Sequence, residues 1–150
     1  MGRFRSFLLR PIRLVLREAV DSWNLPVASQ QVTRCCIDYS AVSLLLSNGV
    51  SVYIEGRFVY AGPGGAGSTL DPDGEASALA PVVRLRRLLV ADAKAYKDGS
   101  LEMQFEDGSR IFVPADQQYE AWTLSGPGGP DGLKVVSMPG GELAIWTDRR

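Results

Sequence analysis

Residues 98–146 read DGSLEMQFEDGSRIFVPADQQYEAWTLSGPGGPDGLKVVSMPGGELAIW, and this stretch decides the fold class of the chain. Short runs that alternate apolar and polar residues are separated by Asp-Gly and Gly-Gly turns and by Gly/Pro clusters. Alternation with a period of two is typical of a strand with one buried face, and glycine readily adopts the positive φ that tight turns need. The stretch therefore predicts antiparallel strands joined by hairpins.

The turn at Gly108 allows a strand register to be predicted. A two-residue loop would place the apolar residues of the flanking strands on opposite faces of the sheet, because a slip of one residue reverses every side chain. A three-residue loop with Gly108 in the left-handed region instead pairs Met103 with Ile111 and Leu101 with Val113. Burial of all four side chains on one face favours the three-residue loop.

The turn at Gly99 follows the same logic. A three-residue loop sets Ala93 against Met103 and Ala95 against Leu101, so that small residues face large ones. We therefore predict a three-stranded meander over about residues 90–114 with both glycines at positive φ.

Two other turns are expected to be two-residue loops. Asn48-Gly49 and Gly140-Gly141 each lie between apolar runs, and both central residues of a type I′ turn need positive φ. The expected pairs are Leu45 with Val52 and Leu44 with Tyr53 at the first turn, and Met138 with Leu143 and Val136 with Ile145 at the second.

Two segments show helical periodicity. Behind Pro11, which suits the first turn of a helix, apolar residues recur through 12–23 at i, i+3, i+4, i+7 and i+11. We favour a helix that packs on the domain over one that lies on an anionic membrane surface. A second helix is expected near residues 77–89 with Ser77 at its start. Its expected buried stripe is Leu79, Val82, Leu85, Leu88 and Leu89.

These elements predict an α+β fold. We expect a mainly antiparallel sheet of about seven or eight strands in meanders and hairpins, one covering helix and an N-terminal helix. Residues 1–24 are interpreted as a basic amphipathic extension, and residues 25–150 as a single β-rich domain. The Gly/Pro-rich segment 62–76 is interpreted as a mobile linker, because it lacks the lysine and the spacing of a phosphate-binding loop.

The composition fits one globular domain with an uneven charge. The chain has 150 residues, of which 45% are hydrophobic and 22% charged, and its net charge is −1. Residues 1–34 carry six arginines against two acidic residues, which gives +4, and the remainder carries ten basic against fifteen acidic residues, which gives −5. A basic leader therefore precedes an acidic body.

The residue types exclude several chemistries. Histidine is absent, which removes the usual general base near neutral pH and the commonest metal ligand. Cys35 and Cys36 are adjacent, and neighbours in a strand point to opposite faces, so we expect reduced thiols in a cytosolic protein. The acidic residues show no ligand spacing, and three clustered arginines (84, 86 and 87) are fewer than nucleic-acid binding normally needs. We therefore expect no cofactor, no metal and no nucleic acid partner.

The order of motifs in residues 25–147 resembles an uncharacterised actinobacterial domain family. The stretches that carry the resemblance are LSNGVSVYIEG, LDPDG, DGSLEMQFEDGSRIFVP, YEAW and PGGELAIW, of which YEAW and PGGELAIW are the distinctive ones. The basic leader does not match. The resemblance implies a domain boundary but no activity and no catalytic residue.

The candidate binding residues are Asp116, Tyr119, Glu120 and Trp122. Tyrosine and tryptophan are common interface anchors, although large aromatic residues in strands mostly pack in the core, which is the favoured interpretation here. Acid–base chemistry by Asp116 and Glu120 is disfavoured because histidine, a nearby lysine and a nucleophile spacing are all lacking.

The sequence favours a non-catalytic role over an enzymatic one. We expect a small cytosolic module of adaptor or immunity type that binds one protein partner. One alternative is a small-ligand binder or weak enzyme that uses a pocket of the four candidate residues, and another is peripheral membrane association through the basic N-terminal helix. A deep pocket with a carboxylate whose pKa is raised by burial would favour the ligand binder, and a flat exposed apolar patch would favour protein binding.

Overall fold

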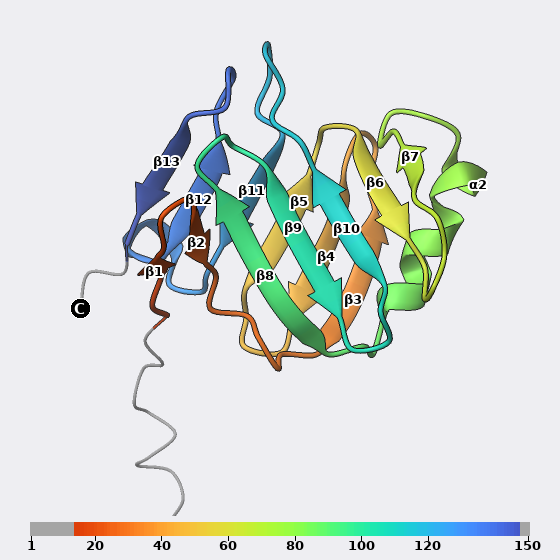
Figure 1. The fold of residues 1–150 in the computed structure, drawn as a ribbon, viewed down its shortest axis with the longest axis horizontal. Coiled ribbons are helices and arrows are strands. Elements are labelled where there is room, and N and C mark those ends of the chain that lie inside the picture. Colours follow the sequence, from red (N-terminus) through yellow and green to blue (C-terminus); the bar gives the residue numbers. More distant parts are fainter. Residues whose placement is uncertain (1–13, 148–150) are drawn as a thin grey trace, which may run out of the picture.

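The structure is a computed structural model that describes residues 14–147. In this part of the chain, thirteen strands form two antiparallel sheets that pack face to face around one core (Figure 1). The seven-stranded sheet has the order β1-β2-β8-β9-β10-β6-β7. Its strands are β1 (Arg17–Glu18), β2 (Ser22–Asn24), β6 (Phe58–Ala61), β7 (Ser68–Leu70), β8 (Val90–Tyr96), β9 (Leu101–Phe105) and β10 (Arg110–Val113).

The six-stranded sheet lies behind the first in Figure 1 and has the order β13-β12-β11-β5-β4-β3. Its strands are β3 (Val32–Ile37), β4 (Val42–Leu46), β5 (Ser51–Ile54), β11 (Trp122–Ser125), β12 (Lys134–Ser137) and β13 (Leu143–Trp146). The chain passes from this sheet to the other after β5, and it returns after β10. Both crossings lie at the same end of the sandwich, and they form the cleft described below.

The predicted α+β class is wrong, because the described part of the chain is a β-sandwich with one short helical segment. The α-helix α2 covers only Ala76–Leu79 and continues as the 3₁₀ helix η1 (Ala80–Leu85). Pro81 has no N–H to donate to the Ser77 carbonyl, so the α-helical ladder cannot continue through it. A second 3₁₀ turn, η2, covers Gly129–Asp131.

The prediction of an N-terminal helix is also wrong for the part of that segment that the structure describes. Residues 17–18 and 22–24 form β1 and β2, and β2 pairs with β8 so that Trp23 lies opposite Ala95. Residues 11–13 of the predicted helix lie outside the described residues. A short amphipathic pattern gives little helix stability by itself, so backbone pairing with an open sheet edge overrides it.

The register of the meander is confirmed. Met103 lies opposite Ile111 and Ala93, and Leu101 lies opposite Val113 and Ala95. Gly99 and Gly108 have φ values of 96° and 91°. All of the paired apolar side chains are buried, so burial of one common face did select the register.

The registers predicted at the other two hairpins are wrong by one residue. Leu44 pairs with Val52, because the Leu46 N–H donates to the Val50 carbonyl across a three-residue loop. At the last hairpin Val136 pairs with Ala144, because the Met138 N–H donates to the Glu142 carbonyl in the same way. In these loops, as in the two loops of the meander, the last loop residue is a glycine at positive φ. A three-residue loop with a left-handed third residue is therefore the common turn of this fold.

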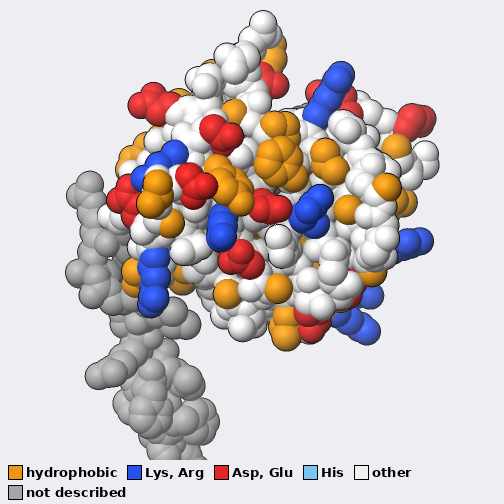
Figure 2. Space-filling view, viewed as in Figure 1, with side chains coloured by type: hydrophobic (Ala, Val, Ile, Leu, Met, Phe, Trp, Pro, Cys, Tyr) orange, Lys and Arg blue, Asp and Glu red, His pale blue; other side chains and the backbone are white. Residues whose placement is uncertain are grey.

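The segment interpreted as a mobile linker contains an ordered strand. β7 pairs with β6 at the edge of the seven-stranded sheet, and Leu70 lies opposite Phe58. Next to it, α2 and η1 close the side of the sandwich, with Leu79, Val82 and Leu85 buried in the core. Leu89 does not complete the expected stripe, since it is exposed, whereas Leu88 is half-buried and packs against the core. Figure 2 shows the outward face of the seven-stranded sheet, where acidic and basic side chains are interspersed.

Two hairpin turns from different sheets pack directly on each other. A Cβ at Gly99 would lie 2.5 Å from the carbonyl oxygen of Gly141, and a Cβ at Gly141 would clash with the Asp98 carbonyl. The Gly99 carbonyl accepts hydrogen bonds from the Trp122 indole N–H at 2.9 Å and from the Ser137 hydroxyl at 2.7 Å. The β8–β9 turn is therefore fixed to β11 and β12 at the end of the sandwich that carries the cleft.

Candidate functional site

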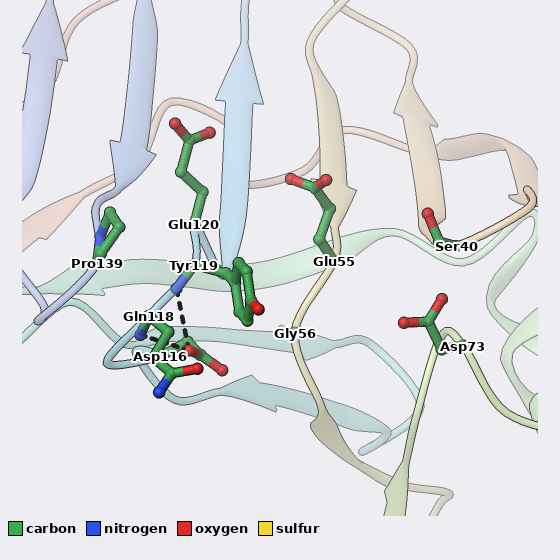
Figure 3. A pocket seen from close by; sticks show the side chains of 9 residues that line it. All are labelled: Ser40, Glu55, Gly56, Asp73, Asp116, Gln118, Tyr119, Glu120 and Pro139. Atoms are coloured by element: carbon green, nitrogen blue, oxygen red, sulfur yellow. Dashed lines mark hydrogen bonds between the residues drawn. The ribbon is translucent and has the colours of Figure 1, made fainter.

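An open cleft of about 610 Å³ lies where the two chain crossings meet. Its walls come from the β3–β4 turn, the residues after β5, the turn after β7, the β10–β11 connection and the last hairpin. The lining residues are Ser40, Glu55, Gly56, Asp73, Asp116, Gln118, Tyr119, Glu120 and Pro139 (Figure 3). Four of these nine residues are carboxylates, and none is a lysine or an arginine.

Backbone pairing brings Glu55 and Glu120 together. The N–H groups of Glu55 and Gly56 both donate to the Ala121 carbonyl at 2.9 Å. Gly56 permits this close approach, because a Cβ there would lie 3.3 Å from the Ala121 Cβ. The two glutamates therefore flank the same strand ends, at the start of β11 and the end of β5.

The proximity of these glutamates changes their electrostatics. Burial raises the pKa of the Glu55 carboxyl above its usual range, and the Glu120 carboxylate raises that pKa further. Like charges close together disfavour the ionised form, and a cation bound between them would relieve this repulsion. The pair is therefore suited to receive a positively charged group.

Asp116 has a structural role in the same loop. Its Oδ1 accepts hydrogen bonds from the backbone N–H groups of Gln118 at 2.8 Å and Tyr119 at 3.1 Å, shown as dashed lines in Figure 3. Its carbonyl accepts the Gly140 N–H at 2.8 Å, which joins the loop to the last hairpin. These bonds hold Tyr119 at the cleft with 70% of its surface exposed.

The opposite wall depends on a tight turn after β7. Asp71 Oδ1 accepts the Asp73 N–H at 2.9 Å, and the Asp71 carbonyl accepts the Gly74 N–H at 2.8 Å. Arg57 lies 3.3 Å from Asp71 and neutralises it, whereas Asp73 projects to the cleft. The turn thus adds a fourth carboxylate without adding a cation to the lining.

The structure brings three of the four predicted site residues together. Asp116, Tyr119 and Glu120 line the cleft, but Trp122 is fully buried and its indole bonds to Gly99 in the core. Trp122 begins β11 and points between the sheets, whereas residues 116–120 precede the strand. Both aromatic residues were expected to pack in the core. Trp122 does so, whereas Tyr119 is exposed.

Sequence reasoning missed Glu55, Asp73 and Ser40. Each of them lies just beyond the end of a strand or in a turn between strands, where a polar residue is ordinary. Their convergence depends on which strands pair across the two sheets, and no local pattern encodes that pairing. The only indication of these three residues in the sequence is that they lie in or beside the turns that flank β4, β5 and β7.

The described part of the chain shows no other obvious chemistry. Within residues 14–147, no group of three or more Cys, Asp or Glu side chains is placed to hold a metal ion. Burial raises the pKa of the Cys35 thiol to about 11, with a smaller contribution from Cys36, so Cys35 is protonated near neutral pH. Across the described residues, no helix is both long enough and apolar enough to span a membrane.

The two sheets and the cleft coincide with the region that matches a known family. The model of the "Family of unknown function (DUF6188)" matches residues 23–147. The chain belongs to this family. The DUF6188 match starts within β2 and ends just after β13, so it includes every strand of both sheets except β1. No curated protein and no solved structure shows significant similarity to the chain.

Proposed function

We propose that this DUF6188 domain is a non-catalytic binding module of adaptor or immunity type, and that its acidic cleft binds a basic segment of a protein partner. The observation that carries the proposal is the convergence of four carboxylates on one open cleft without a cation in its lining. A lysine or arginine side chain there would interact with several carboxylates at once. The exposed Tyr119 ring adds a surface on which a cationic group can stack.

The local chemistry supports binding rather than catalysis. The chain contains no histidine, and Cys35 holds its proton and donates to the Val82 carbonyl at 3.7 Å. Asp116 already accepts two backbone N–H groups. No described lining residue is therefore a ready nucleophile with a paired base.

A small cationic ligand is the second candidate for the same cleft. Its volume of about 610 Å³ is in the range of small-molecule sites, and the raised pKa of Glu55 is the feature expected for a ligand pocket. However, Tyr119 and Pro139 are the only large apolar residues in its lining. Small-molecule sites usually have mainly apolar walls, so the cleft fits a side chain of a larger partner better.

Two finer statements, on location and on origin, are proposals as well, whereas membrane association is not. A cytoplasmic location is supported by the two free cysteines, Cys35 and Cys36. An actinobacterial origin and a family signature at YEAW and PGGELAIW remain predictions from the resemblance. Membrane association depended on a helix over 11–23, and residues 17–18 and 22–24 of that segment form strands instead.

Peptide binding by the full chain tests the proposal. The probe is a fluorescent nine-residue peptide of alternating arginine and glycine, and its affinity is measured by fluorescence polarisation. We expect the double variant Glu55→Gln/Glu120→Gln to weaken binding at least about tenfold, since each lost charge-assisted contact contributes roughly 1 kcal/mol or more. The affinity of wild type should also fall with added salt.

A charge-matched variant provides the control. Asp21→Asn/Asp131→Asn changes the net charge by the same amount at two exposed positions outside the cleft lining. We expect it to bind the peptide as wild type does. Equal weakening by both double variants would show general attraction to the acidic body and would overturn the proposed site.

A further inference from the structure

The outward face of the six-stranded sheet is uncharged at its centre. The strand registers place six residues in one outward row across all six strands, of which Val136 is itself buried at 4% exposure: Cys36, Ser43, Tyr53, Thr123, Val136 and Ala144. The next row contains Leu45, Ser51 and Ser125 between Arg34 at one side and Lys134 and Trp146 at the other. The intervening side chains, from Cys35 to Ile145, point into the core.

The outward face of the seven-stranded sheet is different. Asp92, Lys94, Glu102 and Arg110 project from its central strands and form ion pairs at 3.9 and 4.0 Å. This is the face with interspersed charges in Figure 2. A sandwich normally keeps both outward faces polar, so the uncharged face indicates a surface that is covered in use. Tyr53 and Trp146 on that face are 39% and 48% exposed.

Charges of opposite sign lie at the two ends of the uncharged face. Lys134 starts β12 and Arg34 is the third residue of β3 at one end, and Asp38 and Glu142 flank β3 and β13 at the other. Alternation along the strands points Arg34 and Lys134 outward, and Asp38 and Glu142, just outside β3 and β13, are exposed. Within residues 14–147, none of the four forms an ion pair. The face therefore has a basic end and an acidic end.

We infer that this face binds a second copy of the chain in a two-fold dimer whose two sheets pack face to face. A two-fold axis that lies between the two sheets, parallel to them and perpendicular to the strands, brings the basic end of one copy over the acidic end of the other. Lys134 then faces Glu142 of the second copy, and Arg34 faces its Asp38. An axis parallel to the strands would instead oppose like charges, so the charges select one arrangement.

The size of the face indicates a weak dimer. Six strands about 4.8 Å apart, two outward rows about 7 Å apart and a further step of about 7 Å to Asp38 and Glu142 give a patch of about 24 by 14 Å between Cα positions. Side chains enlarge it to roughly 600 Å² per copy, below the roughly 800 Å² of a standard stable interface. The expected Kd is on the order of 10–100 μM.

Sedimentation velocity of the full chain from about 1 to about 500 μM tests the inference across this range of Kd. We expect the sedimentation coefficient of wild type to rise from the monomer to the dimer value. Thr123→Lys puts a charge at the centre of the face and should keep the chain monomeric. Gln104→Lys makes a matched change on the seven-stranded sheet and should dimerise as wild type does, with circular dichroism confirming that both variants are folded.

Charge reversal tests the arrangement of the two copies. Lys134→Glu and Glu142→Lys should each weaken the dimer at least about threefold, and the double variant should restore it, because the reversed charges again face each other. A wild type that stays monomeric at the highest concentration, or equal effects of Thr123→Lys and Gln104→Lys, would overturn the inference. Asp38 and Glu142 are outside the cleft lining, so peptide binding can succeed or fail independently of this result.

Discussion

At the scale of single residues, two Asp-Gly turns that look alike in sequence have different surroundings. Gly99 and Gly108 both have positive φ, and Asp98 and Asp107 each accept the N–H two residues on. A Cβ at Gly99 would meet the Gly141 carbonyl at 2.5 Å, whereas the nearest atom at Gly108 is 4.0 Å away. The turn chemistry was predictable, but the contact between turns was not, because it joins positions more than forty residues apart.

The two glycines should therefore respond differently to alanine. Gly108→Ala should lower the free energy of unfolding by about 1–2 kcal/mol, the usual penalty for a side chain in the left-handed region. Gly99→Ala should lower it by more than about 3 kcal/mol, because its Cβ also meets backbone that cannot rotate away. Urea unfolding of both variants measures the difference, and equal losses would contradict the close approach of the two turns.

The Cys35 thiol gives a second prediction at this scale. Burial raises its pKa from 9.0 to about 11, so at pH 8 its thiolate fraction is about a hundredfold lower than that of an ordinary cysteine. We expect alkylation of Cys35 by iodoacetamide at pH 8 to be correspondingly slower in the folded than in the unfolded chain, measured by mass spectrometry. The same shift makes folding less stable as the pH rises from 9 towards 11, since only the unfolded state ionises freely there.

At the scale of elements, hairpin registers were predictable where burial was used to choose the loop length. The meander was correct because the odd-numbered apolar residues had to share one face. At Asn48-Gly49 the prediction used the preference of Asn-Gly for a two-residue turn, which pairs Leu45 with Val52. In the structure Leu44 pairs with Val52. Leu44 and Val52 are both buried, so the burial argument would have selected the observed register there too.

The helical elements were the least predictable. The pattern over residues 77–89 has helical spacing, but the 3₁₀ helix ends at Leu85, Arg86 has a ψ of 131° and Arg87 has a φ of 82°. In the N-terminal segment, residues 22–24 pair with β8 as strand β2 and do not form the predicted helix. At the N-terminal segment a tertiary contact decided the local structure, whereas over residues 77–89 the missing N–H of Pro81 interrupts the α-helical ladder.

The link between β11, β12 and the β8–β9 turn gives a prediction at the scale of elements. The buried Gly99 carbonyl accepts the Trp122 indole and the Ser137 hydroxyl. Trp122→Phe and Ser137→Ala should each lower the free energy of unfolding by about 1–2 kcal/mol. The double variant leaves the carbonyl without either partner, so its loss should exceed the sum of the single losses by about 1 kcal/mol or more. Additive losses in a double-mutant cycle would show that the two bonds are independent.

At the scale of the whole molecule, the cleft combines residues from five separate parts of the chain. Sequence reasoning identified Asp116, Tyr119 and Glu120 because they lie together in one segment rich in aromatic and acidic residues. Glu55 joins them only because β5 pairs with β11 across nearly seventy residues of sequence. The site was therefore partly predictable from local composition, and its remainder required the sheet order.

The two central glutamates predict a pH dependence of peptide binding. The pKa of Glu55 is raised by burial and by Glu120, so Glu55 gains its proton at a higher pH than an ordinary glutamate, and affinity for a basic peptide should fall as the pH drops through that raised pKa. Because the folded pKa is raised, this group makes the fold more stable as pH falls through that pKa. Glu120→Gln should lower the pKa of Glu55, which carboxyl-detected NMR titration would measure. An unchanged Glu55 titration would contradict the coupling.

The packing of the β8–β9 turn against the last hairpin also matters for the practical handling of this protein. An epitope tag or a fluorescent label inserted at Asp98-Gly99 would force two backbones apart, whereas the same insertion at Asp107-Gly108 extends into open space. Surface engineering, such as immobilisation on a sensor chip or insertion of a reporter domain, should therefore use the Asp107-Gly108 turn.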